Sequence, residues 1–342
     1  MSASGTIRIT AARELLSAVT KRRPEYAEFS ARAGVSRETL QASSGTIPLA
    51  TFTSMLEAAA YETGNGSLGL ELGKTFRFSA LGPIARLLET APTLGAALEQ
   101  FTRHFGSIQT NTHSALYMSD GSARLVYSIN DPAVRFRNQD AAFTLAVEYS
   151  MLANLVGPAW EAAGIDFEQS ASADLPFYQE HFDCPLRFGC ENNAIVFPSR
   201  LLDAPMRDMD RVVNARIAAD LAETTRYQTV RLDLIESIEA WVTASLCRTV
   251  STDMELVASD FGMSARTFQR ALSDHGVHYL GIRNKVRSHI AKCLLAETNL
   301  PVTAIALQLG YSETSAFSRG FKTLVGETPL DFRRRSNCSL HA

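Results

Sequence analysis

The sequence has no long hydrophobic run and little that marks an exported or membrane-bound protein. No stretch reaches the roughly 18 consecutive apolar residues expected of a membrane span, and we therefore expect no membrane partner. Residues 1–5 lack the charged and apolar regions of a secretory signal peptide. These absences predict a cytoplasmic protein.

Cysteine is scarce and has no paired spacing. The 5 cysteines form no Cys-x-x-Cys motif, and their odd number disfavours a complete disulfide framework. His104, His113 and His181 lack metal-ligand spacing. The sequence also contains no Walker loop, no nucleophile elbow and no convincing pair of catalytic carboxylates. We expect no metal site, no cofactor and no enzymatic activity.

Three glycines between residues 64 and 69 have the spacing of a nucleotide-binding motif. Gly64, Gly66 and Gly69 match the Gly-x-Gly-x-x-Gly spacing of dinucleotide-binding loops. That loop must follow a strand and open a helix, whereas these glycines follow a predicted helix. We interpret them as a helix end and a turn.

Charge is distributed unevenly along the 342 residues. The net charge of −3 by itself disfavours a nucleic-acid partner. Residues 261–335, however, hold 11 Lys and Arg against 5 Asp and Glu, a balance of +6 that leaves −9 for the rest. This asymmetry is typical of a DNA-binding module joined to an unrelated domain.

Residues before 205 mix helical and strand periodicities, which predicts an α+β domain. Asp120 and Gly121 lie between two apolar runs and predict a hairpin. We expect a second hairpin that turns through residues 191–193. Thr93 is a natural N-cap for the helix expected at residues 93–105. The expected helices span residues 11–19, 48–62, 83–88, 93–105 and 140–156, and the expected strands span 116–118, 124–127, 165–167, 186–188 and 194–197.

The remaining chain predicts a helical connector followed by an all-α domain. Residues 203–228 are rich in Arg, Asp and Ala, and Val212, Ile217 and Leu221 form a thin apolar stripe that suits pairing with another helix or with the first domain. A helix is expected at residues 232–246. We therefore divide the chain into an α+β domain (residues 1–205), a helical linker (206–230) and a carboxy-terminal domain (231–336).

The carboxy-terminal domain contains an internal repeat. Residues 257–264 return in pattern as residues 305–312, and each copy leads to a Phe and an Arg two residues apart: Phe268 with Arg270, and Phe317 with Arg319. Each copy predicts a short helix, a Gly turn and a second helix that carries Arg. Two such helix-turn-helix units in tandem indicate a DNA-binding domain.

The first helix of the first copy has a clear start and an apolar face. Thr252 and Glu255 match a capping box, so we expect the helix to begin there. Leu256, Val257 and Phe261 are expected to face the core.

The second helix of this copy is the expected recognition helix. Gly262 suits the positive φ of the turn, Ser264 is a natural N-cap, and Phe268 and Leu272 hold the helix on the core. Arg and Gln on the opposite face can make bidentate contacts with guanine and adenine edges. The DNA-binding candidates are Ser264, Arg266, Thr267, Gln269 and Arg270.

The second copy repeats this logic. Ile305, Ala306 and Leu309 are expected to face the core, and Ser312 is expected to cap the recognition helix. The helix expected at residues 279–297 joins the copies and would hold them near the roughly 34 Å spacing of successive major-groove segments. The DNA-binding candidates are Thr314, Ser315, Ser318, Arg319 and Lys322, of which Lys322 is expected to reach the backbone.

The arginines outside the two recognition helices are not expected to read DNA bases. Arg283 and Arg287 on the joining helix are expected to form a solvated face. Residues 333–335 are all Arg, and they either touch phosphates or belong to a frayed end.

Two long patterns resemble a known family. Residues 304–322 and 326–333, which include Gly310-Tyr311-Ser312 and Phe317-Ser318-Arg319-Gly320-Phe321, are similar to AraC-type transcriptional regulators, and residues 262–270 fit the same pattern. Gly320 stands where that family usually has Ala. Residues 67–73, 91–98, 182–189 and 192–198 resemble the α+β sensor domain of one AraC-type subfamily.

The resemblance implies a sequence-specific regulator that binds double-stranded promoter DNA. It further implies a small-molecule effector at the amino-terminal domain, RNA polymerase as a partner, and the capacity to form a homodimer. A ligand-independent dimeric DNA binder and an enzyme fused to an AraC-like module are the alternatives. A self-methylating DNA-repair protein would need a Pro-Cys-His-Arg motif and a four-Cys zinc site, and neither occurs in the sequence.

Overall fold

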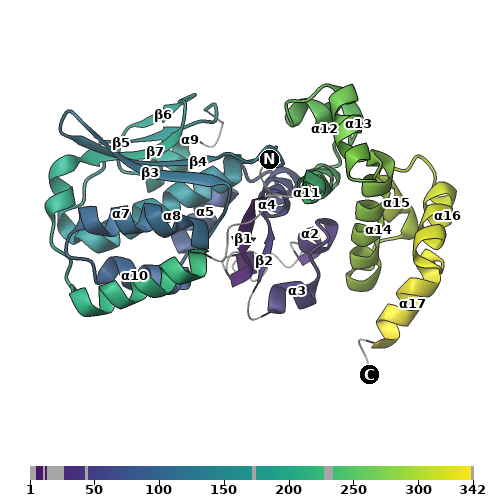
Figure 1. Cartoon of the computed structure of the whole chain (residues 1–342), viewed down its shortest axis with the longest axis horizontal. Helices are drawn as coiled ribbons and strands as arrows, with labels where there is room; N and C mark the ends of the chain where they lie inside the picture. Colours follow the sequence, from purple (N-terminus) through teal and green to yellow (C-terminus); the bar gives the residue numbers. More distant parts are fainter. Residues whose placement is uncertain are drawn as a thin grey trace.

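We describe a computed structural model of the chain, covering residues 5–10, 12–13, 27–42, 45–171, 175–226 and 234–339. A part with two sheets and several helices is followed by a wholly helical part, which confirms the predicted fold class (Figure 1). No helix within these ranges is long and apolar enough to cross a membrane.

The larger sheet has five strands in the order β3-β4-β7-β5-β6, and only β5 and β6 are parallel. The predicted hairpin is confirmed, because β3 and β4 join through Asp120 and Gly121, whose φ angles of 49° and 77° suit the twist of a tight hairpin turn. The strand bounds are β3 Thr112–Ser119, β4 Ser122–Ile129, β5 Gly164–Phe167, β6 Leu186–Phe188 and β7 Asn193–Pro198.

The second predicted hairpin is wrong, although both of its strands exist. β6 and β7 are not neighbours, because β5 lies between them and pairs with both. The first five residues of β7 are all buried, whereas β6 is only partly buried. A fully buried strand needs hydrogen-bonding partners on both edges, and β4 and β5 supply them.

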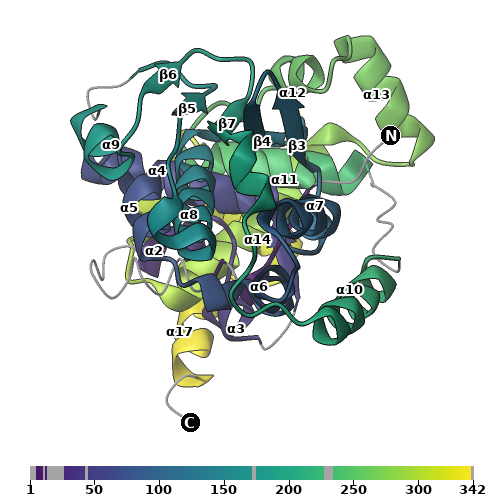
Figure 2. The same cartoon turned by 90° about the vertical axis from the view of Figure 1, so that its left-hand side faces the viewer.

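Helices pack against one face of this sheet, as both views show (Figures 1 and 2). Thr93 caps α7 as predicted, since its Oγ1 accepts a hydrogen bond from the Ala96 amide at 3.3 Å. Helices α7 (Leu94–His104), α8 (Asn138–Val156) and α9 (Leu175–His181) contact the sheet, while α5 (Leu68–Thr75) packs against α8 and α6 (Pro83–Glu89) packs against α7. Short 3-10 turns occur at Phe78–Leu81 (η2), Phe105–Ser107 (η3), Gly157–Ala159 (η4) and Ser199–Asp203 (η5).

Glycines in α5 permit its close contact with α8. A Cβ at Gly69 would collide with the Gln139 carbonyl oxygen, and one at Gly73 would collide with Ala146. Gly64 ends the preceding helix with a φ of 63°. The interpretation as a helix end and a turn is therefore confirmed for Gly64 and Gly66, whereas Gly69 lies inside α5 and permits its close packing on α8.

The predicted connector is a helix, α10 (Arg211–Arg226), and it packs against the amino-terminal part rather than standing alone. Asn214 is buried and its Nδ2 donates to the Leu87 carbonyl at 2.7 Å, while Leu221 also faces inward. Val212 is 80% exposed and does not belong to the packed stripe. Figure 2 shows α10 beside α6.

A small second sheet lies toward the carboxy-terminal helices (Figure 1). Its strands β1 (Thr6–Arg8) and β2 (Thr46–Pro48) precede α4 (Leu49–Thr63), close to the helix expected at residues 48–62. Two short helices, α2 (Ala27–Arg32) and α3 (Arg37–Gln41), lie between these strands in the sequence. The helix expected at residues 11–19 falls outside the described residues except for positions 12 and 13.

The carboxy-terminal part consists of helices alone. Within the described residues 234–339 its helices are α11 Leu234–Cys247, α12 Met254–Asp260, α13 Ala265–Asp274, α14 Tyr279–Glu297, α15 Val302–Gln308, α16 Thr314–Val325 and α17 Pro329–Ser339. The pairs α12–α13 and α15–α16 flank α14, which begins and ends where the sequence predicted. Helix α4 packs against α11, and α2 packs against α14, so the two parts of the chain share an extensive contact.

Candidate nucleic-acid interface

The turn of the first helix-turn-helix unit has the predicted geometry. Gly262 has a φ of 66°, and Ser264 caps α13 by accepting a hydrogen bond from the Thr267 amide at 3.2 Å. The two hydroxyl oxygens of Ser264 and Thr267 lie 2.9 Å apart. These two side chains fix the start of α13 and remain exposed beside it.

Aromatic packing fixes the orientation of α13. Phe268 and Leu272 are buried, and the Phe268 ring meets the rings of Phe261 and Tyr279 at centroid distances of 6.5 and 5.9 Å. Because these residues hold one face of the helix on the core, the opposite face must point to solvent. That face carries exposed Arg266, Gln269 and Arg270.

These exposed groups are available for a partner. Within the described residues neither Arg266 nor Arg270 takes part in an ion pair, and the side-chain amide of Gln269 makes a 3.4 Å contact with the Met254 sulfur. Three polar side chains project from the first turns of one helix, as contacts with base edges in a major groove require.

Two predictions for α12 are wrong. The N-cap of the helix is Asp253 and not Thr252. Thr252 is buried, and its carbonyl oxygen accepts a hydrogen bond from the Tyr279 hydroxyl at 2.7 Å. This contact ties the residue to α14 and removes it from the cap position. Leu256 is 38% exposed, so the buried face of α12 consists of Val257, as predicted, and Ala258.

The second unit has the same internal construction. Gly310 has a φ of 72°, and Ile305, Ala306 and Leu309 are buried as predicted. Phe317 and Phe321 hold α16 on the core, with the Tyr311 ring 5.5 Å from that of Phe317. The duplicated motif therefore folds twice into a helix pair with its aromatic residues inside.

The start of α16 differs from the prediction. Its N-cap is Glu313 and not Ser312, one residue later than the pattern of the first unit, and Ser315 Oγ donates to the Glu313 carboxylate at 3.0 Å. An acidic group at a helix N-terminus is favoured by the helix dipole. Ser315, Arg319 and Lys322 are exposed, whereas Thr314 and Ser318 are half-buried.

Arg287 has a structural role that the sequence did not reveal. Its Nη2 donates to the Gly310 carbonyl oxygen at 3.3 Å, and its guanidinium carbon lies 4.7 Å from the centre of the Tyr311 ring. Burial, followed by the charge of Arg283, lowers the Arg287 pKa. The expectation of a solvated face is wrong for Arg287, because spacing along α14 cannot show that the turn of the second unit folds over it.

The three arginines at residues 333–335 differ in their contacts. Arg333 is used internally, since its Nη2 donates to the Leu300 carbonyl oxygen at 2.6 Å. Arg335 pairs with Glu327 at 2.7 Å. Arg334 is largely exposed and lies 4.0 Å from Asp331.

Two arginines join the first unit to the amino-terminal part of the chain. Arg135, in the loop after β4, pairs with Asp260 at 2.9 Å and lies 5.0 Å from the centre of the Trp241 ring. Trp241 donates to the same Asp260 carboxylate at 2.8 Å. The end of α12 is therefore held by a side chain from the other part of the chain.

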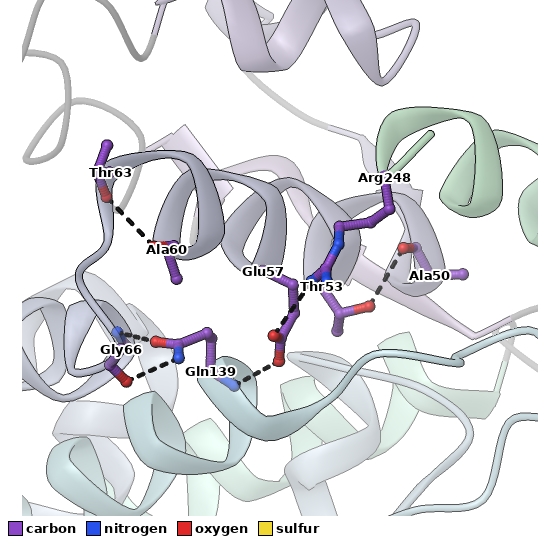
Figure 3. Close-up of polar contacts among 9 residues, drawn as sticks. Ala50, Thr53, Glu57, Ala60, Thr63, Gly66, Gln139 and Arg248 are labelled. Carbon is purple, nitrogen blue, oxygen red and sulfur yellow. Dashed lines mark hydrogen bonds and ion pairs between the residues drawn. The ribbon is translucent and has the colours of Figure 1, made fainter. Parts of the chain in front are cut away.

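Arg248 makes the reverse connection. Its Nη1 lies 3.5 Å from the Glu57 carboxylate on α4, and its guanidinium stacks 4.6 Å from the centre of the Phe136 ring. Figure 3 shows Glu57 between Arg248 and Gln139. The backbone N–H of Gln139 donates to the Glu57 carboxylate at 2.8 Å, and the Gln139 side chain donates to the Gly66 carbonyl oxygen at 2.9 Å. Burial raises the pKa of Glu57, and its hydrogen bonds and Arg248 oppose that rise.

Two helix-turn-helix units on one central helix, each with an exposed polar face, define a double helix-turn-helix DNA-binding module. Two family models match the chain: "Arabinose-binding domain of AraC transcription regulator, N-term" over residues 25–206, and "Helix-turn-helix domain" over residues 257–335. The chain belongs to the AraC family and is an AraC-type DNA-binding transcriptional regulator.

Several known proteins are similar along most of the chain. The HTH-type transcriptional regulator VirS of Mycobacterium tuberculosis is 29% identical over 289 residues, covering 83% of this chain and 84% of that protein. The ornithine utilization regulator of Pseudomonas aeruginosa is 26% identical over 303 residues, covering 88% of each. The crystal structure of the transcriptional regulator CdpR from Pseudomonas aeruginosa is 22% identical, covers 81% of this chain and 91% of that chain, and has a TM-score of 0.41.

Proposed function

We propose that α13 and α16 are the two recognition helices and that they enter neighbouring segments of the major groove of promoter DNA. The observation that carries this proposal is the paired construction of the two units. Buried Phe268 and Leu272 fix one face of α13, buried Phe317 and Phe321 fix one face of α16, and Arg projects from the opposite face of each helix. The proposed contacts are Ser264, Arg266, Thr267, Gln269, Arg270, Thr314, Ser315, Ser318, Arg319 and Lys322.

These contacts divide into base readout and positioning. Arg266, Gln269, Arg270 and Arg319 are exposed and suit base edges, because guanidinium and amide groups form bidentate hydrogen bonds with guanine and adenine. Lys322 lies further along α16 and suits a phosphate. The hydroxyl residues at the two helix starts would fix the register on the backbone.

The test uses the full chain and DNA selected by its own binding. Arg270→Ala or Arg319→Ala should weaken binding to the selected site by roughly 1–3 kcal/mol and relax the preference at one base position. Arg86→Ala, an exposed arginine on α6, is the matched control and should change neither. Fluorescence anisotropy titrations that give wild-type affinity for both variants would refute the assignment of these arginines.

A salt titration tests the positioning role of Lys322. Lys322→Ala should weaken binding to all sequences alike and reduce the slope of log affinity against log salt by about 1. A loss confined to one base position would instead assign Lys322 to base readout.

We also propose that residues 1–205 sense a small-molecule effector, that residues 206–230 connect the domains, and that residues 231–336 bind DNA. The direct contacts of Arg135 and Arg248 between the two parts support control of one by the other. RNA polymerase and a second copy of the chain are the further proposed partners. The alternative, a ligand-independent dimeric DNA binder, would show a concentration-dependent dimer and an affinity for DNA that no metabolite changes.

A further inference from the structure

A cleft of about 750 Å³ lies between the amino-terminal part of the chain and the helices α11 and α14. Figure 1 shows α2, α3, β1 and β2 facing these two helices. The volume falls within the roughly 300–1,000 Å³ of small-molecule sites. Because its two walls come from the two parts of the chain, any molecule in the cleft touches both.

The amino-terminal wall offers hydroxyl and apolar groups. Ser36, Thr39 and Thr51 line it beside Ile47 and Pro48, and every residue described on this wall is uncharged. Such a wall suits a neutral body with some capacity for hydrogen bonding, and it offers no counter-ion to a charged group.

All of the charge on the described lining lies on the other wall. Glu236 and Glu239 come from α11, and Lys285 and Lys292 come from α14. Glu239 and Lys285 pair with each other at 2.6 Å. Glu236 and Lys292 are exposed, and neither has an ion-pair partner among the residues that the structure describes. The residues that line the cleft therefore include one carboxylate and one ammonium group without an ion-pair partner among the described residues, and their formal charges cancel.

Helix α11 connects this cleft to the first helix-turn-helix unit. Glu236, Glu239 and Thr243 face the cleft at helical spacing. Trp241 lies on the opposite side of the helix, where it donates to Asp260 at the end of α12. A molecule that moves α11 would therefore act on the contact that fixes the first unit.

We propose that this cleft binds a free amino acid or a similar small zwitterion, with its ammonium group toward Glu236, its carboxylate toward Lys292 and its apolar part against the hydroxyl-lined wall. The proposal rests on the effector control proposed above and names the site and the chemical class of the effector. A compound of a single charge would leave one of these two groups without a partner, whereas a zwitterion satisfies both.

The experiment measures binding to the full chain by isothermal titration, after a thermal-shift screen. The probes are the common L-amino acids together with 4-aminobutyrate and 6-aminohexanoate, which widen the distance between the two charges. For each probe that binds, its N-acetyl derivative removes the ammonium charge and its decarboxylated amine removes the carboxylate. We expect both derivatives to bind about 10- to 100-fold more weakly than the parent. Equal binding of parent and derivatives, or no binding by any probe, overturns the proposal.

Two substitutions locate the site. Glu236→Gln and Lys292→Gln should each weaken binding about 10- to 100-fold, and Glu236→Gln should abolish the advantage of the parent over its N-acetyl derivative. Glu180→Gln and Lys74→Gln, exposed positions on α9 and α5, are the matched controls. Binding that is unchanged in both cleft variants places the zwitterion elsewhere and refutes the site.

The same preparation is titrated with its selected DNA in the absence of any probe. Loss of specific DNA binding would overturn the proposed function. Specific DNA binding combined with no zwitterion binding would overturn only the cleft proposal.

Discussion

Glu148 should lower the stability of the protein as the pH rises. The side chain lies on α8 with 1% of its surface exposed, and within the described residues neither carboxylate oxygen has a hydrogen-bond partner. Burial raises its pKa from 4.5 to about 8. The folded protein therefore keeps a proton on Glu148 at pH values where the unfolded chain has lost it.

The free energy of unfolding falls as the pH rises because the folded and unfolded states bind different numbers of protons. Below pH 4.5 the carboxyl group is protonated in both states, and stability is unaffected. Between 4.5 and about 8 only the folded state holds the proton, so each pH unit lowers the free energy of unfolding by about 1.4 kcal/mol. From about pH 5 to about pH 7.5 the loss amounts to about 3 kcal/mol.

Glu148→Gln removes this titration while it preserves the shape of the protonated acid. Urea unfolding at several pH values should give nearly equal stabilities for the variant and the wild type at about pH 5, and an advantage of about 3 kcal/mol for the variant at about pH 7.5. Glu180→Gln, an exposed carboxylate on α9, should show no such divergence. Parallel pH profiles for wild type and Glu148→Gln would refute the burial of a protonated acid.

Three further substitutions test packing and the contact between the two parts of the chain. Gly69→Ala should destabilise the fold by roughly 1–3 kcal/mol, measured by urea unfolding, because its methyl group would collide with the backbone of α8. Gly320→Ala should stabilise it by up to ~1 kcal/mol in the same assay, because its Cβ meets only the Tyr311 hydroxyl at an ordinary 3.5 Å. Arg135→Ala should speed amide hydrogen exchange in α12 and leave α15 unchanged, since it frees Asp260 from the amino-terminal part.

Features that the sequence predicted correctly depend on short-range chemistry. The turn at Asp120 and Gly121, the cap at Thr93 and the positive φ of Gly262 each follow from a few consecutive residues. Helix α14 was predicted with its observed bounds because its apolar periodicity ends where extended residues begin. Secondary structure of this kind is encoded locally.

Features that the sequence did not predict depend on contacts between distant residues. In the sheet β5 lies between β6 and β7, so the buried strand β7 pairs with β4 on one edge and with β5 on the other. The short distance in sequence between β6 and β7 does not show this order. Arg287 has the helical spacing of an ordinary surface residue, but Gly310 and Tyr311 fold over its guanidinium group. The role of Glu57 in holding Arg248 likewise connects positions 191 residues apart.

The two helix-turn-helix units are duplicated in sequence but are held in different ways. The first is tied to the amino-terminal part, because Asp260 accepts contacts from both Arg135 and Trp241. The second is tied to the carboxy-terminal helices, because Arg287 of α14 holds its turn at Gly310. A change in the amino-terminal part therefore acts directly on the first unit through Asp260, and it reaches the second through α14, which α2 contacts. In the proposed docking of both units in neighbouring grooves, moving one unit relative to the DNA is sufficient to alter the affinity of the pair.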